Sequence, residues 1–211
     1  MEEPAAMDGI RTTALSIAPD EVFLSLTSDQ ISVKYGSQIN LTTQATRKDK
    51  SVLSGLPLYL EFKGFDESTW REIAKPVTTE TGSFTSGLYL AKSGKLRVRS
   101  DGGWDRGEGL SPELSVIVNP RLNISAPTSA KAGSPFKVLV SASPITLGAQ
   151  ATLQRFDGKT WANLISVPLL AADTELLATE LERGVFTYRI SVISSADSAQ
   201  ATTAPFIILV R

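Results

Sequence analysis

The chain has no cysteine and no histidine among its 211 residues. These absences exclude several kinds of active site, because Ser-His-Asp and Cys-His systems need an imidazole or a thiolate, and zinc is bound mainly by the same groups. The glycines form neither a Gly-x-x-x-x-Gly-Lys-Ser/Thr phosphate loop nor a Gly-x-Gly-x-x-Gly dinucleotide motif. We therefore expect a protein that is not an enzyme and that carries no cofactor.

A charge excess and long apolar runs are also missing. The 21 Lys and Arg residues nearly balance the 22 Asp and Glu residues, so the formal net charge is −1. Such a chain lacks the basic surface that nucleic acids and anionic membranes attract. Its longest apolar runs are short stretches such as residues 206–210, well below the roughly 18 residues of a membrane-spanning helix. We expect neither a nucleic-acid partner nor membrane insertion, and the acidic start Met1-Glu2-Glu3-Pro4 is unlike an export signal.

What the sequence does contain is a series of short β-branched and aromatic segments separated by turn residues. Such segments are typical of β-strands. The expected strands lie at residues 22–26, 31–35, 39–43, 58–62, 69–73, 82–85, 96–99, 114–118, 122–124, 136–140, 151–156, 186–190 and 206–210. Residues 171–181 leave both a helical turn and a strand open, because Leu177 and Leu181 recur at helical spacing within a short segment.

The two halves of the chain match in their motifs. Residues 34–37, Lys-Tyr-Gly-Ser, correspond to residues 131–134, Lys-Ala-Gly-Ser, and each motif precedes an apolar segment. Further on, Phe62 precedes a polar turn and a Thr-Trp pair, and we align it with Phe156, which does the same. The match indicates an internal repeat.

The spacings between later residues agree as well. Trp70 precedes Arg97 by almost the same number of residues as Trp161 precedes Arg189. The repeat has a period of about 92 residues, which is too long for a solenoid unit and suits an antiparallel β-sandwich. We therefore expect Trp70 and Trp161 to be packing residues of the core or of a sheet face.

The repeat predicts an all-β fold of two tandem antiparallel β-sandwich domains. We place the domains at residues 21–119 and 120–211, behind a flexible lead-in or extra strand at residues 1–20. The boundary follows from Asn119-Pro120, because proline removes a backbone donor and forces the preceding residue toward an extended conformation. So short a linker predicts a semi-rigid rod.

The order of these motifs resembles that of known repeats. The order is strand, Lys-x-Gly-Ser, strand, aromatic strand, Thr-Trp, Gly-Ser-Phe, Arg-x-Arg strand, polar loop and Val-x-Val strand. It is similar to that of the bacterial immunoglobulin-like or fibronectin-III-like repeats found in tandem in exported surface proteins. The resemblance covers residues 21–211, with one copy of the motif order in each half, although the second copy lacks Gly-Ser-Phe. It implies Ig-like domains, and a spacer or adhesive module of a longer chain at the cell surface or outside the cell.

Residues 101–109 form the most distinctive loop, because they have no counterpart in the second half. Trp104 lies there among four glycines and is the candidate for contact with a partner, whether a protein or a cell-wall glycan. Asp101, Asp105 and Glu108 supply hard oxygen donors that could bind calcium. Their spacing is not that of an EF-hand, and Arg106 stands among them, so a solvated loop is the competing interpretation.

Arg97 and Arg99 alternate with apolar residues, which places both guanidinium groups on the outer face of one strand. They could form an anion-binding stripe, but we expect them to pair with acidic residues on neighbouring strands.

Three functions remain open from the sequence. The first is a non-catalytic spacer or adhesive module that presents loops to a partner. The second is a carbohydrate-binding module, which requires Trp70, Trp104 or Trp161 to be exposed on a flat face. The third is an assembly subunit, in which the lead-in or residues 22–26 would add as a strand to a neighbour's open sheet edge.

Overall fold

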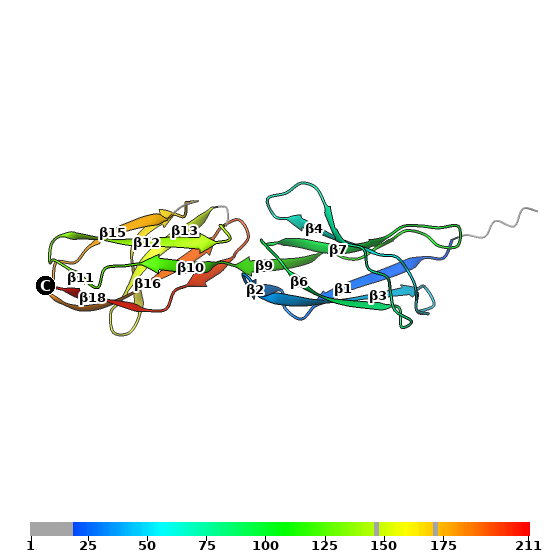
Figure 1. Cartoon of the computed structure of the whole chain (residues 1–211), viewed down its shortest axis with the longest axis horizontal. Coiled ribbons are helices and arrows are strands. Elements are labelled where there is room, and N and C mark those ends of the chain that lie inside the picture. Colours follow the sequence, from blue (N-terminus) through cyan, green and yellow to red (C-terminus); the bar gives the residue numbers. More distant parts are fainter. Residues whose placement is uncertain (1–18, 146–147, 171–172) are drawn as a thin grey trace, which may run out of the picture.

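The computed structural model describes residues 19–145, 148–170 and 173–211. These residues form 18 β-strands and contain no helix, and therefore none that could cross a membrane. The strands build two β-sandwiches that lie end to end, with the C-terminus at the far end of the second (Figure 1). The predicted all-β fold is confirmed. Most of the predicted lead-in, residues 1–18, lies outside the described residues.

The first sandwich consists of strands β1–β9 in two facing sheets. Its smaller sheet has the order β1 (Val22–Ser28), β3 (Gln38–Arg47), β6 (Ser83–Tyr89). Its larger sheet has the order β2 (Ser32–Lys34), β9 (Leu114–Asn119), β7 (Gly94–Ser100), β4 (Tyr59–Gly64), β5 (Arg71–Ala74), with β8 (Gly109–Leu110) paired to β7.

The second sandwich, strands β10–β18, repeats this arrangement strand for strand. Its smaller sheet has the order β10 (Arg121–Ser125), β12 (Pro135–Ser143), β15 (Thr174–Thr179). Its larger sheet has the order β11 (Ser129–Ala130), β18 (Phe206–Val210), β16 (Gly184–Ser194), β13 (Ala149–Phe156), β14 (Trp161–Pro168), with β17 (Gln200–Thr202) paired to β16. Both are Ig-like sandwiches, as predicted.

Each sandwich has its own hydrophobic core. Buried and exposed residues alternate along the central strands, as in β7 and β12, because successive side chains point to opposite faces of a sheet. The first core includes Ile39 and Leu96, the second includes Leu153 and Ile208, and the two clusters share no residue. Burial of each such side chain contributes about 1.5–3 kcal/mol. Packing within each half therefore holds the fold together without any disulfide.

Two sequence predictions are corrected by the structure. The helical interpretation of residues 171–181 is wrong, because Thr174–Thr179 is strand β15, paired with β12; residues 171 and 172 lie outside the described residues. The alignment of Phe62 with Phe156 is off by one residue. Glu61 pairs with Arg97 and Gln154 pairs with Arg189, so Phe62 corresponds to Arg155. The physical reason is that a one-residue slip reverses the face of a side chain: Phe62 is buried, whereas Phe156 is exposed.

Asn119 connects the two sandwiches. Only Pro120, which is buried, lies between β9 and β10. The Asn119 side chain donates to Ser32 Oγ at 2.9 Å within the first sandwich, and its Oδ1 accepts the backbone N–H of Gln200 at 2.9 Å from the second. An open pocket of about 140 Å³ also lies between residues 65–66 and 92–93 of the first sandwich and residues 145, 196 and 197 of the second. The two bodies thus contact each other around a one-residue connection.

Candidate functional site

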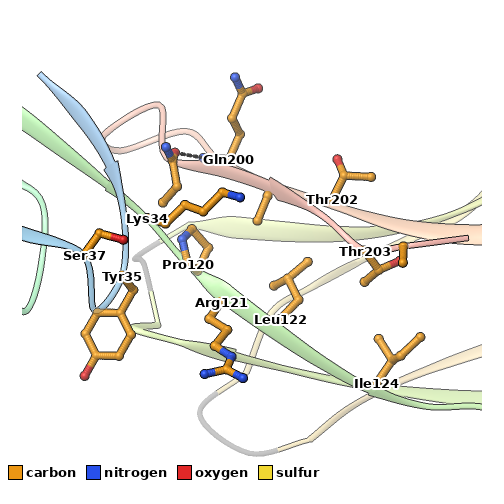
Figure 2. Close-up of a pocket in the computed structure, with 13 residues that line it drawn as sticks. Lys34, Tyr35, Ser37, Pro120, Arg121, Leu122, Ile124, Gln200, Thr202 and Thr203 are labelled. Carbon is orange, nitrogen blue, oxygen red and sulfur yellow. Dashed lines mark hydrogen bonds between the residues drawn. The ribbon is translucent and has the colours of Figure 1, made fainter. Parts of the chain in front are cut away.

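A groove of about 880 Å³ opens at the junction of the sandwiches (Figure 2). We call it the junction groove. Three segments line it: residues 34–37 after β2, residues 119–124 of the connection and β10, and residues 200–204 of β17 and its continuation. Segments that are far apart in the sequence therefore meet in one place, which is the usual condition for a binding site.

The groove opens because β10 is less covered than its counterpart β1. Val22 and Leu24 of β1 are buried, and the backbone of Gly109 in β8 lies directly over them: a Cβ there would come within 2.7 Å of Val22 Cγ1. The residue at the equivalent register in β17 is Ala201. Because Ala201 carries a Cβ, β10 cannot approach β17 in the same way.

The consequence is an apolar strip along the floor of the groove. Leu122 is only half-buried and Ile124 is 36% exposed, although both lie on β10 where β1 carries buried residues. Both residues line the groove. A partly exposed apolar strip of this kind offers burial to a ligand.

The lining of the groove includes two cations without acidic partners. Lys34 and Arg121 line the groove and form no ion pair with any other residue that the structure describes. No Asp or Glu occurs among the described residues that line it. The groove therefore carries an uncompensated positive charge within a protein of nearly neutral net charge.

Aromatic and hydroxyl groups complete the lining. Tyr35 is 41% exposed, and in Figure 2 its ring and the Arg121 guanidinium point to the same side, whereas Lys34 extends toward β17. The hydroxyls of Ser37 and Thr202 also line the groove. The arrangement can donate several hydrogen bonds, neutralise an anion and stack against a flat apolar face.

The loop that carries Trp104 lies at the opposite end of the first sandwich. Trp104 is 89% exposed, the largest exposed fraction of any large apolar residue among those described. Residues 103–107 are tied down beneath it: Asp20 donates its N–H to the Asp105 carbonyl at 3.1 Å, and the Asp20 carbonyl accepts the Gly107 N–H at 2.8 Å. The predicted contact residue therefore projects from a braced loop.

The predicted calcium ligands are not brought together. Asp101 accepts hydrogen bonds from the Tyr59 hydroxyl, at 2.7 Å, and from Arg99, and these two donors lower the pKa of the Asp101 carboxyl. Asp105 forms an ion pair with Arg106 at 3.3 Å. Throughout the described ranges, no three acidic side chains lie close enough together to hold a metal ion. Calcium binding by Asp101, Asp105 and Glu108 thus has no geometric support here and stays a prediction.

The repeated tryptophans lie on sheet faces, beneath arginines. The Arg97 guanidinium lies 4.2 Å from the ring centroid of Trp70, and Arg189 lies 4.3 Å from that of Trp161. Both rings are half-buried. This confirms packing on a sheet face and leaves neither ring free as a flat sugar-binding platform.

The arginines of β7 are paired, as the sequence analysis expected. Arg97 and Arg99 donate to the two carboxylate oxygens of Glu61, at 2.6 and 3.4 Å. In the second sandwich Arg189 instead donates to the neutral Gln154 at 2.7 Å. No free anion-binding stripe exists on β7. The sequence analysis did not name Glu61 or Gln154, because which residues face each other across a sheet follows from the strand register and not from the motifs.

A buried polar cluster replaces apolar contacts in the second sandwich. Tyr188, which is fully buried, donates to Glu180 at 2.8 Å, and Glu180 accepts from Arg155 at 2.7 Å. Burial raises the pKa of the Tyr188 hydroxyl, and the Glu180 carboxylate raises it further. The equivalent pair in the first sandwich is Phe62 and Leu96, both apolar. Every member of the cluster is hydrogen-bonded, so it stabilises the core and offers nothing to a ligand.

The sequence analysis did not identify the junction groove. One signal was present: the matching turns at residues 34–37 and 131–134 differ at a single position, where Tyr35 stands in place of Ala132. A large exposed ring at one copy of a repeated turn marks a local role. That this turn meets β10 and β17 could only come from the tertiary structure.

Comparison with known proteins assigns no family. No family model matches the chain. No curated protein matches it. Among similar solved structures, the Yersinia pseudotuberculosis adhesin InvE has 11% identity and a TM-score of 0.41 over 88% of this chain and 58% of that chain.

Two further structures show a similar degree of likeness. A marsupial T cell receptor has 12% identity and a TM-score of 0.37, over 90% of this chain and 72% of that chain. The FN1–FN3 domains of chicken CNTN1 have 10% identity and a TM-score of 0.35, over 91% of this chain and 66% of that chain. Identities and scores this low carry no information about function.

Proposed function

We propose that this protein is a non-catalytic structural or adhesive module, a semi-rigid rod that presents loops to a partner. The observation that carries the proposal is Asn119, whose side chain is hydrogen-bonded to both sandwiches across a connection of one residue. A side chain fixed on both sides limits the angles that the two bodies can adopt. The rod would hold the Trp104 loop and the junction groove at a defined separation.

The chemistry of the described residues supports a role without catalysis. The chain has no histidine or cysteine, and the junction groove contains no carboxylate that could act as a general base. We propose further that the module belongs to a longer bacterial chain and acts at the cell surface or outside the cell, where a protein or a glycan would be its partner. This part of the proposal rests on the resemblance of the sequence motifs to exported surface repeats.

Trp104 is the residue that we assign to partner contact at the end of the rod. Exposed tryptophans on braced loops bind with little loss of conformational freedom, and they are enriched among residues that dominate binding energy. The hydrogen bonds from Asp20 to the loop support this assignment, since they hold the backbone around Trp104 in place.

Small-angle X-ray scattering tests the rod. We expect an elongated monomer whose profile does not change with protein concentration, and a Gly-Gly-Ser insertion between Asn119 and Pro120 should broaden the distribution of interatomic distances. The same insertion after Lys50, in an exposed turn of the first sandwich, is the control and should leave the distribution unchanged. A wild-type profile of two freely jointed bodies, or a ladder of oligomers, would contradict the proposal, and the ladder would favour assembly by strand addition.

A further inference from the structure

We propose that the junction groove binds an acidic saccharide, namely an oligosaccharide that carries carboxylates. The inference rests on the adhesive role proposed above and names the chemistry of one partner. It depends on four features of the groove: its charge, its polar lining, its apolar floor and how far its strand edges are free to pair with a peptide.

The charge selects an anion. Lys34 and Arg121 lie in the same groove, have no acidic partner among the described residues, and face no carboxylate from any lining segment. Elsewhere in the described part of the chain some arginines are neutralised, as Arg97 and Arg99 are by Glu61, whereas others, such as Arg189, form no ion pair. A pair of cations without counterions is complementary to a ligand with one or two negative charges.

The polar lining suits a polyhydroxylated ligand. Ser37, Gln200, Thr202 and Thr203 contribute hydroxyl and amide groups to the lining from two different segments. The exposed ring of Tyr35 lies near Ser37 in Figure 2 and can stack on the C–H face of a pyranose. A saccharide presents this combination of hydroxyl groups and an apolar ring face.

The floor and the size agree with a ligand of a few sugar units. Leu122 and Ile124 form the apolar floor, whereas their counterparts on β1, Leu24 and Leu26, are buried. A volume of about 880 Å³ falls within the range of roughly 300–1,000 Å³ that is typical of small-molecule sites.

An extended peptide fits the groove less well. Strand addition needs a free edge several residues long. β17 has only three residues and its Gln200 N–H is bonded to Asn119, whereas β10 (Arg121–Ser125) has an unpaired outer edge. The polar groups of the lining come from separate short segments and do not follow one strand at a two-residue period. The side chains of the groove thus suit an array of hydroxyl groups, and a peptide paired to the edge of β10 is the competing occupant that the test must distinguish.

The test measures binding of tetragalacturonate to the intact chain by isothermal titration calorimetry, with maltotetraose as the neutral comparison and an oligoglutamate as the acidic peptide. We expect the uronate to bind, the two others to bind at least tenfold more weakly, and the uronate affinity to fall as the salt concentration rises. Absence of uronate binding, equal binding of the neutral sugar, or preference for the peptide would each overturn the inference.

Matched variants locate the site. The double variant Lys34→Gln with Arg121→Gln should lose at least tenfold in uronate affinity. The control, Lys131→Gln with Arg183→Gln, removes the same charge; Lys131 occupies the equivalent turn of the second sandwich, and neither residue lines the groove. Equal losses in both double variants would overturn the inference, because they would indicate attraction to the whole surface.

Tyr35→Ala tests the stacking contact and should also weaken binding at least tenfold, with an unchanged far-ultraviolet circular dichroism spectrum. Unchanged affinity in Tyr35→Ala would remove the ring from the site and overturn the saccharide assignment. X-ray scattering of the same samples separates the two proposals. A rod that binds no uronate overturns only this inference, whereas a flexible or oligomeric wild-type protein overturns the proposed function.

Discussion

Single residues show how the two copies of the fold have diverged at equivalent positions. Glu61 and Gln154 both accept a hydrogen bond from an arginine that covers a tryptophan, but only Glu61 is charged and serves a second arginine. The stacked geometry survives the loss of the charge, because the arginine is held by its ring contact as well as by its acceptor.

Asp157 offers a pH-dependent test at the scale of one residue. Its carboxylate accepts the N–H groups of Thr160, at 2.7 Å, and Lys159, at 2.8 Å, and also the Thr160 hydroxyl at 2.8 Å. These bonds lower the pKa of Asp157 from 3.8 to about 2, with the Thr160 N–H as the largest cause. Because the folded pKa is depressed, the stabilisation is complete above about pH 4 and is lost as the pH falls toward 2.

An NMR titration of the Asp157 carboxyl carbon should therefore give a midpoint near 2. In Asp157→Asn, the part of the acid destabilisation between pH 4 and 2 that comes from this turn should disappear. A midpoint at the ordinary value of 3.8 would show that the hydrogen bonds of the turn do not hold in solution.

At the scale of elements, both sandwiches interrupt their last strand in the same way. β8 and β9 are separated by a short segment, as are β17 and β18, and a hydroxyl fills the resulting gap in the ladder. Ser111 Oγ accepts the Val98 N–H at 2.9 Å, and Thr203 Oγ1 accepts the equivalent Ile190 N–H at 3.0 Å. A buried N–H that would otherwise have no acceptor is thus satisfied twice by the same device.

Ser111→Ala tests this device. The variant leaves the buried Val98 N–H without an acceptor, so we expect a loss of about 1–3 kcal/mol in the free energy of unfolding, measured with urea. Ser115→Ala, on the exposed side of β9, is the control and should change stability by less than about 0.5 kcal/mol. Equal urea midpoints for the two variants would contradict the role of Ser111.

At the scale of the whole molecule, the two separate cores suggest two folding units. No buried apolar residue is shared between them, and a connection of one residue joins them. The predicted division into residues 21–119 and 120–211 can be examined directly by producing each half alone.

Each half should fold by itself, with the circular dichroism of a β-protein and a cooperative urea transition. The second half should be less stable than in the intact chain by about 1 kcal/mol, because the Gln200 N–H loses its Asn119 acceptor. Halves that stay unfolded, while the intact chain unfolds in a single transition, would show that the sandwiches depend on each other.

Much of this architecture could be predicted from the sequence, and the errors have a common cause. Strands such as 96–99 and 136–140 were recognisable because alternation follows from local backbone geometry. β14 was not expected, and β15 was left open between helix and strand, because polar residues and leucines on exposed faces obscure the two-residue period. The slip at Phe156 arose because linear motif matching does not determine which residues pair across a sheet.

The sequence by itself therefore determined an all-β chain with two similar halves and without the side chains for thiol or imidazole chemistry. Only the tertiary structure decided the register between strands, the bracing of the junction by Asn119 and the meeting of Lys34, Arg121 and β17 in one groove. The physical reason is the sequence separation of the residues that interact. Periodicity and turns depend on neighbouring residues, whereas register and convergence depend on packing between segments that are far apart in the chain.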